Sequence, residues 1–212
     1  TTVNNKSRSM SLFPKKFLLW IAVLTGLCGS LRADEQQDRS IYQLETKLTD
    51  QFGHEIGLDV FRGQPVLISM FYASCPMACP LLIHEIQRLE SGLDPVTLSS
   101  TRVLLVSFDP TRDTPKALEA LARERGVDQS RWRFATASEA QVRELAAVLG
   151  IKYRRLAAGG FDHTSVITLL NPKGGIEVRL EGQKQEDASW VSRLRALAAE
   201  QPSAPGTRPK AP

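Results

Sequence analysis

An apolar run that leads directly into a helical pattern constrains the fold of this chain more than any other feature. Residues 65–72 (PVLISMFY) are almost continuously apolar, as in a strand that is buried on both faces of a sheet. A second buried strand is predicted at 102–108 (RVLLVSF). Between the two strands, apolar residues recur at helical spacing over 80–93, at Leu82, Ile86, Leu89 and Leu93. This order favours a parallel strand–helix–strand unit.

Caps and turns delimit the elements that follow. Thr114 and Pro115 begin a helix that ends at Gly126, and Ser138 with Gln141 forms a capping box for a helix that ends at Gly150. The pattern continues with a strand at 151–156, a hairpin of 165–170 and 176–181 around NPKGG, and a helix at 186–199. An earlier hairpin is expected within 44–62. The sequence therefore predicts an α/β, thioredoxin-like fold, with a central mixed sheet flanked by helices.

The two ends of the chain differ from its middle. Residues 1–33 carry Lys6, Arg8, Lys15, Lys16 and Arg32 and no acidic residue, so without them the net charge of +4 becomes −1. The near-neutral remainder removes the main argument for nucleic-acid binding. The lysines precede a short apolar run, which predicts a signal peptide or an N-terminal anchor and an exported protein. We expect a linker at 34–43, one domain at 44–200 and a disordered tail at 201–212.

Two cysteines lie at the junction between the first buried strand and its helix, in the segment SCPMACP (74–80). Loops at the carboxyl ends of strands are where open α/β sheets place their sites, and a helix N-terminus favours the thiolate form. Cys75 and Cys79 are four residues apart and share one face of a helix. Two thiolates select soft ions such as Cu(I), whereas structural zinc needs four ligands. A disulfide between the two cysteines is the alternative, although so short a loop gains little stability.

A third ligand must come from elsewhere in the chain. His54 falls in a predicted turn, and His84 falls on the outer face of the first helix. His163 opens the strand SVITLL and follows Asp162, whose carboxylate could orient the imidazole. From these residues alone, His163 is either a copper ligand or a strand-end histidine without a role in binding.

In sum these motifs resemble the SCO/SenC family of copper-binding, thioredoxin-like proteins. The resemblance runs from about residue 44 to 182 and rests on LTDQFG, FYASCPMACP, SFDPTRDTP and FDHTSVITLLNPKG in that order. It implies that Cys75, Cys79 and His163 bind copper. Family members often carry an acidic residue where this chain has Met77, whose thioether either contacts copper or has no role. Asp109 and Asp113 are either structural residues of a turn and helix entry or residues that face a partner.

The resemblance also implies a function. The family delivers copper to the Cu(A) centre of cytochrome c oxidase or reduces the cysteines there. We therefore expect a metallochaperone in the periplasm or at the outer face of the inner membrane, with copper as its ion. Its expected partner is the Cu(A) subunit or another copper or thiol protein. The alternative is a thiol–disulfide oxidoreductase in which Cys75 and Cys79 are catalytic. A peroxidase lacks support, because Tyr72 stands where a catalytic threonine is expected.

Overall fold

The computed structural model describes residues 40–75, 78–181 and 188–200. The predicted leader at 1–33 and the predicted disordered tail at 201–212 lie outside these residues, as does Met77. Within the described part of the chain, no helix is both long and apolar enough to cross a membrane.

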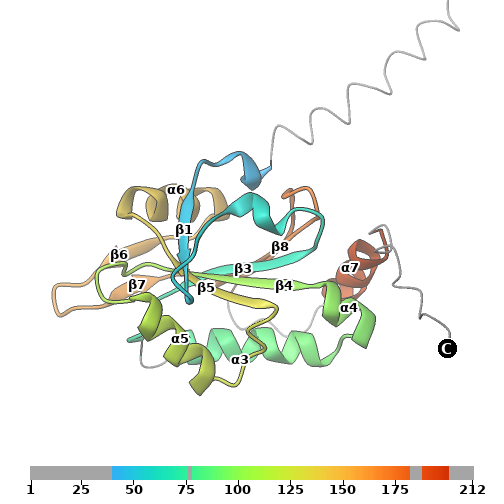
Figure 1. The fold of residues 1–212 in the computed structure, drawn as a ribbon, viewed down its shortest axis with the longest axis horizontal. Helices are drawn as coiled ribbons and strands as arrows, with labels where there is room; N and C mark the ends of the chain where they lie inside the picture. Colours follow the sequence, from blue (N-terminus) through green and yellow to red (C-terminus); the bar gives the residue numbers. More distant parts are fainter. Residues whose placement is uncertain (1–39, 76–77, 182–187, 201–212) are drawn as a thin grey trace, which may run out of the picture. The chain divides into compact units, whose positions relative to one another are not determined.

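A seven-stranded mixed sheet forms the centre of the domain (Figure 1). The strand order is β2-β1-β5-β4-β3-β8-β9. β3, β4 and β5 run parallel to one another, while β1 and β8 pair antiparallel to β5 and β3. The predicted α/β, thioredoxin-like fold with a central mixed sheet is confirmed. The strands of this sheet are β1 (Lys47–Asp50), β2 (Glu55–Gly57), β3 (Val66–Phe71), β4 (Arg102–Ser107), β5 (Trp132–Thr136), β8 (Val166–Leu170) and β9 (Ile176–Glu181).

Helices cover both faces of the sheet. In Figure 1, α3 (Ala78–Ser91) and α5 (Pro115–Glu124) lie on one side and α6 (Glu139–Leu149) on the other. The predicted caps are present: the Thr114 hydroxyl accepts a bond from an amide of α5, and Ser138 and Gln141 form the capping box of α6. The last helix is α7 (Ala188–Ala199). The sequence analysis missed α4 (Pro95–Ser100), which Asp94 caps by accepting bonds from two amides.

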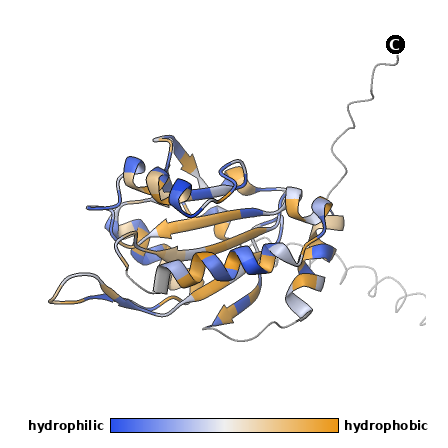
Figure 2. Ribbon diagram, turned by 90° about the horizontal axis from the view of Figure 1, so that it is seen from below, coloured by the Kyte–Doolittle hydropathy of each residue, from blue (hydrophilic) through white to orange (hydrophobic). Residues whose placement is uncertain are grey.

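The core lies between the sheet and these helices. Every residue of β3 is buried, as are all residues of β4 after Arg102 (Figure 2 shows these strands as the hydrophobic centre of the domain). On α3, Leu82, Ile86 and Leu89 face this core as predicted. The parallel strands therefore hold the residues that follow them, Tyr72 and Phe108, at one end of a rigid layer.

The packed domain begins earlier than the predicted boundary at residue 44. Ile41 and Tyr42 form a short 3₁₀ helix, η1 (Ile41–Gln43), and both side chains are buried. The Ile41 amide donates to the carbonyl of Gly174 at 3.0 Å, and the Ser40 hydroxyl donates to the carbonyl of Lys173. The end of the predicted linker thus packs on the β8–β9 turn, a long-range contact that local polarity does not reveal.

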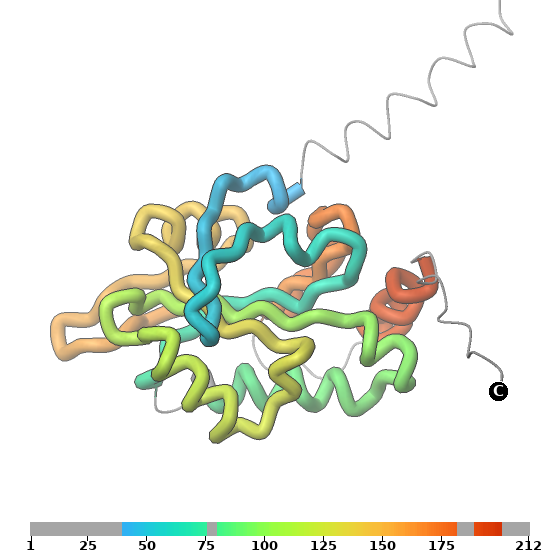
Figure 3. Tube along the Cα trace, in the orientation of Figure 1, coloured from blue at the N-terminus to red at the C-terminus, as the bar shows by residue number. Residues whose placement is uncertain are grey.

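A separate hairpin carries His163. β6 (Tyr153–Arg155) pairs with β7 (Phe161–His163), and this two-stranded sheet extends from one end of the domain (Figure 3). The prediction that His163 opens the strand SVITLL is wrong, because His163 is the last residue of β7 and β8 starts at Val166. Between β7 and β8, the amide of Thr164 donates to the carbonyl of Lys152 at 2.9 Å, which extends the pairing of the hairpin by one residue.

Candidate metal centre

Cys75 lies in the loop that follows β3. Its amide donates to the carbonyl of Tyr72 at 3.2 Å, which closes a tight turn, and the residue is only 9% exposed. Cys79 is the second residue of α3, so its backbone lies in the first helical turn. Cys75 is not helical, so the prediction that the two cysteines share one face of a helix is wrong. Its side chain lies outside the described part of the structure. The convergence of the two thiols on one ion therefore stays a prediction.

The imidazole of His163 is held by one nitrogen and leaves the other without a protein partner. Nδ1 lies 3.2 Å from the carbonyl oxygen of Thr164, a distance at which Nδ1–H donates. Nε2 is buried and makes no hydrogen bond within the described structure. A neutral imidazole with its proton on Nδ1 presents a lone pair at Nε2, the atom that coordinates a metal ion. A buried acceptor without a partner is unfavourable unless a ligand satisfies it, so this geometry suits a metal ligand.

The predicted role of Asp162 in orienting the imidazole is wrong. Successive residues of a strand point to opposite faces, so Asp162 and His163 diverge. The Asp162 carboxylate instead accepts from Nη2 of Arg154, directly across the hairpin, at 3.0 Å, and both side chains are well exposed. The backbone carbonyl of Thr164 takes the orienting role that the sequence analysis assigned to the aspartate.

Aromatic side chains surround the imidazole and connect it to the cysteine loop. The ring centroid of His163 lies 6.0 Å from that of Tyr72 and 5.1 Å from that of Phe108. Tyr72 also packs edge-on against Phe161 at 5.3 Å. Because the carbonyl of Tyr72 binds the amide of Cys75, one residue contacts both the histidine and the cysteine turn. The sequence analysis did not identify these aromatic residues, although each lies at the end of a strand beside a motif.

A buried carboxylate holds the cysteine loop against β4. Oδ2 of Asp113 accepts from the amide of Ala73 at 2.9 Å and from the hydroxyl of Ser107. Asp113 is 2% exposed, and this burial raises its pKa, although the two hydrogen bonds oppose the shift. Of the two roles considered for Asp113, these contacts support the structural one.

Asp109 holds the histidine hairpin in a similar way. Its carboxylate is fully buried and lies 3.0 Å from Nε of Arg112 and 3.7 Å from Nη2 of Arg155 on β6. The guanidinium of Arg155 also lies over the ring of Phe161, at 4.7 Å from its centroid. The segment DPTRD thus contacts the cysteine loop through Asp113 and the hairpin through Asp109. It therefore sets the relative position of the two halves of the candidate site.

The remaining histidines lie where the sequence predicts them. The side chain of His54 is 72% exposed in the β1–β2 turn, and His84 is exposed on α3. Among the residues whose side chains the structure describes, no cluster of three or more histidine, cysteine or acidic residues could hold a metal ion. Cys79, whose side chain lies outside the described part, therefore stays the predicted third ligand beside Cys75 and His163.

The turn of the histidine hairpin makes close contact with Tyr72. Gly160 has φ +77°, and a Cβ atom there would lie 3.1 Å from the Tyr72 hydroxyl. We expect Gly160→Ala to lower the free energy of unfolding by about 1–2 kcal/mol through backbone strain, and also to displace Tyr72. Gly53→Ala is the control, because Gly53 has φ +83° and open space around it. Thermal unfolding and copper titration of both variants test this prediction. If the two variants bind copper with equal affinity, the contact between Gly160 and Tyr72 does not contribute to copper binding.

A thioredoxin-like domain with a cysteine pair at the end of a strand, and a histidine that packs on the tyrosine of the cysteine turn, defines a class of thiol- and metal-handling proteins. A family model described as SCO1/SenC matches residues 34–199, and the chain belongs to this family. This confirms the resemblance inferred from the motifs.

One curated relative and two solved structures are similar to this chain, and the two structures share its fold. The mitochondrial SCO2 homologue of Bos taurus is 28% identical over 187 residues, which cover 75% of this chain and 66% of the relative. The structure of Bradyrhizobium japonicum ScoI with copper bound has a TM-score of 0.61 at 20% identity, covering 72% of this chain and 96% of that one. The structure of BsSco, a member of the Sco family of cytochrome c oxidase assembly proteins with a disulfide switch, has a TM-score of 0.65 at 21% identity. The match covers 75% of this chain and 95% of BsSco.

Proposed function

We propose that this protein is a copper chaperone that holds copper through Cys75, Cys79 and His163. The observation that carries the proposal is the imidazole of His163, whose Nδ1 is committed to the Thr164 carbonyl and whose buried Nε2 has no partner in the described structure. Two thiolates are soft ligands that select Cu(I), and an imidazole also suits copper. The copper-bound ScoI structure of similar fold supports the choice of ion.

We propose the Cu(A) centre of cytochrome c oxidase as the destination of this copper. BsSco, which shares the fold, is described as a member of a family of cytochrome c oxidase assembly proteins. We also propose that the domain works outside the cytoplasm, in the periplasm or at the outer face of the inner membrane, where a cleaved or anchored leader at 1–33 would deliver it. The partner is then the oxidase subunit that carries Cu(A).

Copper retention by the reduced protein tests the proposal. We expect the full chain to bind about one copper ion per molecule and to keep it against a mild chelator. Cys75→Ala and Cys79→Ala should each abolish retention, because each removes one of the two soft thiolate ligands that select Cu(I). Metal analysis after gel filtration provides the measurement, and circular dichroism confirms folding. Copper retention in both cysteine variants would refute the proposed site.

A second candidate function is supported by the disulfide switch described for BsSco. As a reductase, Cys75 thiolate would attack a partner disulfide and release one partner thiolate. Cys79 thiolate would then attack the mixed disulfide, leaving a Cys75–Cys79 disulfide and a fully reduced partner, a transfer of two electrons. His163 is dispensable for this reaction and essential for copper binding. Oxidase assembly in cells that carry His163→Ala therefore separates the two functions.

A further inference from the structure

A polar pocket of about 280 Å³ lies at the end of the sheet opposite the cysteine loop. Cys75 follows the C-terminal end of β3, whereas Arg102 opens β4 and Arg131 directly precedes β5. Because these strands are parallel, the two arginines lie at the other end of the same layer. The charged and polar residues that line the pocket are Asp50, His54, Gln64, Arg102, Ser130, Arg131 and Arg133.

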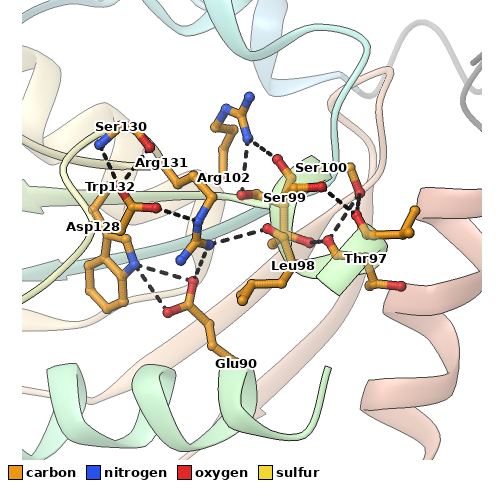
Figure 4. A network of polar contacts seen from close by, with 12 residues as sticks. Glu90, Thr97, Leu98, Ser99, Ser100, Arg102, Asp128, Ser130, Arg131 and Trp132 are labelled. Atoms are coloured by element: carbon orange, nitrogen blue, oxygen red, sulfur yellow. Dashed lines mark hydrogen bonds and ion pairs between the residues drawn. The ribbon is translucent and has the colours of Figure 1, made fainter. Parts of the chain in front are cut away.

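Two of the three arginines in the pocket have carboxylate partners. Nη1 of Arg131 lies 2.6 Å from Glu90, and its Nε lies 3.0 Å from Asp128, so this side chain turns towards α3 (Figure 4). Nε of Arg133 lies 3.7 Å from the buried carboxylate of Asp50. That carboxylate also accepts from two backbone amides of the β1–β2 turn. The acidic groups near the pocket are therefore already engaged.

Arg102 differs from its neighbours because it has no carboxylate within ion-pair distance among the described residues. Its Nη1 donates to the carbonyls of Ser99 and Thr101, at 2.8 and 3.3 Å (Figure 4). Burial, followed by the positive charges of Arg131 and Arg133, lowers the pKa of Arg102, and only Asp128 opposes this effect. The pocket thus holds one half-buried guanidinium that has no carboxylate partner among the described residues, and an anion bound there would supply the missing counter-charge.

We propose that this pocket binds a phosphate group, with Arg102 as its principal cation. The fork of a guanidinium matches the oxygens of a phosphate, and the amide of Gln64 and the imidazole of His54 line the same space. Inorganic phosphate and a phospholipid headgroup share this chemistry.

Thermal unfolding of the full chain tests phosphate binding. We expect sodium phosphate to raise the Tm relative to sodium chloride at equal ionic strength, because a ligand that binds only the folded state stabilises it. Arg102→Gln should weaken phosphate binding at least about tenfold, since one charge-assisted pair is lost. Arg123→Gln is the matched control, because Arg123 is an exposed arginine on α5 that pairs with Glu119. Its response should equal that of the wild type.

The source of the phosphate is tested with vesicles. Co-sedimentation with phosphatidylglycerol vesicles that falls in Arg102→Gln but not in Arg123→Gln identifies a headgroup, because the leader is the same in all variants. A Tm shift without this difference identifies free phosphate. Arg102→Lys, which keeps the charge and loses the fork, replaces Arg102→Gln if that variant fails to fold. Absence of a phosphate-specific Tm shift in the wild type, or an undiminished shift in the Arg102 variants, would overturn the proposal.

Discussion

His163→Ala should lower the affinity of the reduced protein for Cu(I) by at least about a hundredfold, since even the loss of an outer hydrogen-bond partner of a metal ligand lowers affinity by about 10–100-fold. The substitution removes Nε2, the buried acceptor that has no partner in the described structure. Two thiolates would remain, and copper would be left with an open coordination position. Competition titration against a Cu(I) chelator of known affinity measures the change.

The control for this experiment is His84→Ala, which removes an exposed imidazole from the helix that begins at the cysteine motif. It should leave copper affinity unchanged. His163→Gln is the second variant, because glutamine fills part of the space between Tyr72 and Phe108 without supplying an imidazole. Loss of copper in His163→Ala alone would point to disturbed packing, and wild-type affinity in both variants would exclude His163 as a ligand.

Asp113→Ala should lower the free energy of unfolding by about 2–6 kcal/mol, since two donors lose their acceptor and each contributes roughly 1–3 kcal/mol. The two donors are the amide of Ala73 and the hydroxyl of Ser107. The substitution also removes the energetic cost of burying the carboxylate, which favours the lower half of this range. Copper affinity should fall as well, because Ala73 lies two residues before Cys75. Urea unfolding and chelator competition measure the two effects.

Asp113→Asn separates hydrogen bonding from charge. The amide oxygen of asparagine can still accept from Ala73, so this variant should stay within about 1 kcal/mol of the wild type. Asp162→Ala is the control for acidic residues in general, because its exposed pair with Arg154 is worth only about 0–1 kcal/mol. Equal destabilisation by Asp113→Ala and Asp162→Ala would contradict the proposed anchoring of the loop.

The raised pKa of Asp113 also predicts a dependence of stability on pH. As pH rises, the unfolded chain releases this proton near the usual carboxyl pKa of about 4, while the folded protein keeps it to higher pH. Over that interval the folded state binds more protons, so the contribution of Asp113 to the free energy of unfolding falls as pH rises. Asp113→Asn should remove this component. Unfolding free energies of both proteins across the interval measure the difference in slope.

Local patterns predicted most of the fold. The apolar runs of β3 and β4 are buried as expected, and Thr114 and Ser138 cap the helices that they were expected to cap. Hydrophobic periodicity and caps act over a few residues, so they can be recognised in the sequence alone. The same reasoning missed α4, which has only six residues. It also placed His163 in the following strand, because β7 is a separate strand only through its pairing with β6.

The sequence by itself determined the family, the order of most elements, and the positions of Cys75 after β3 and of Cys79 at the start of α3. Only the tertiary structure decided what surrounds His163 and what holds the cysteine loop. The Thr164 carbonyl orients the imidazole in place of Asp162, and Asp113 reaches Ala73 across 40 positions of the chain. Such contacts arise when the strands align and bring their ends together. Local spacing cannot reveal them, because the partners meet only after the sheet has formed.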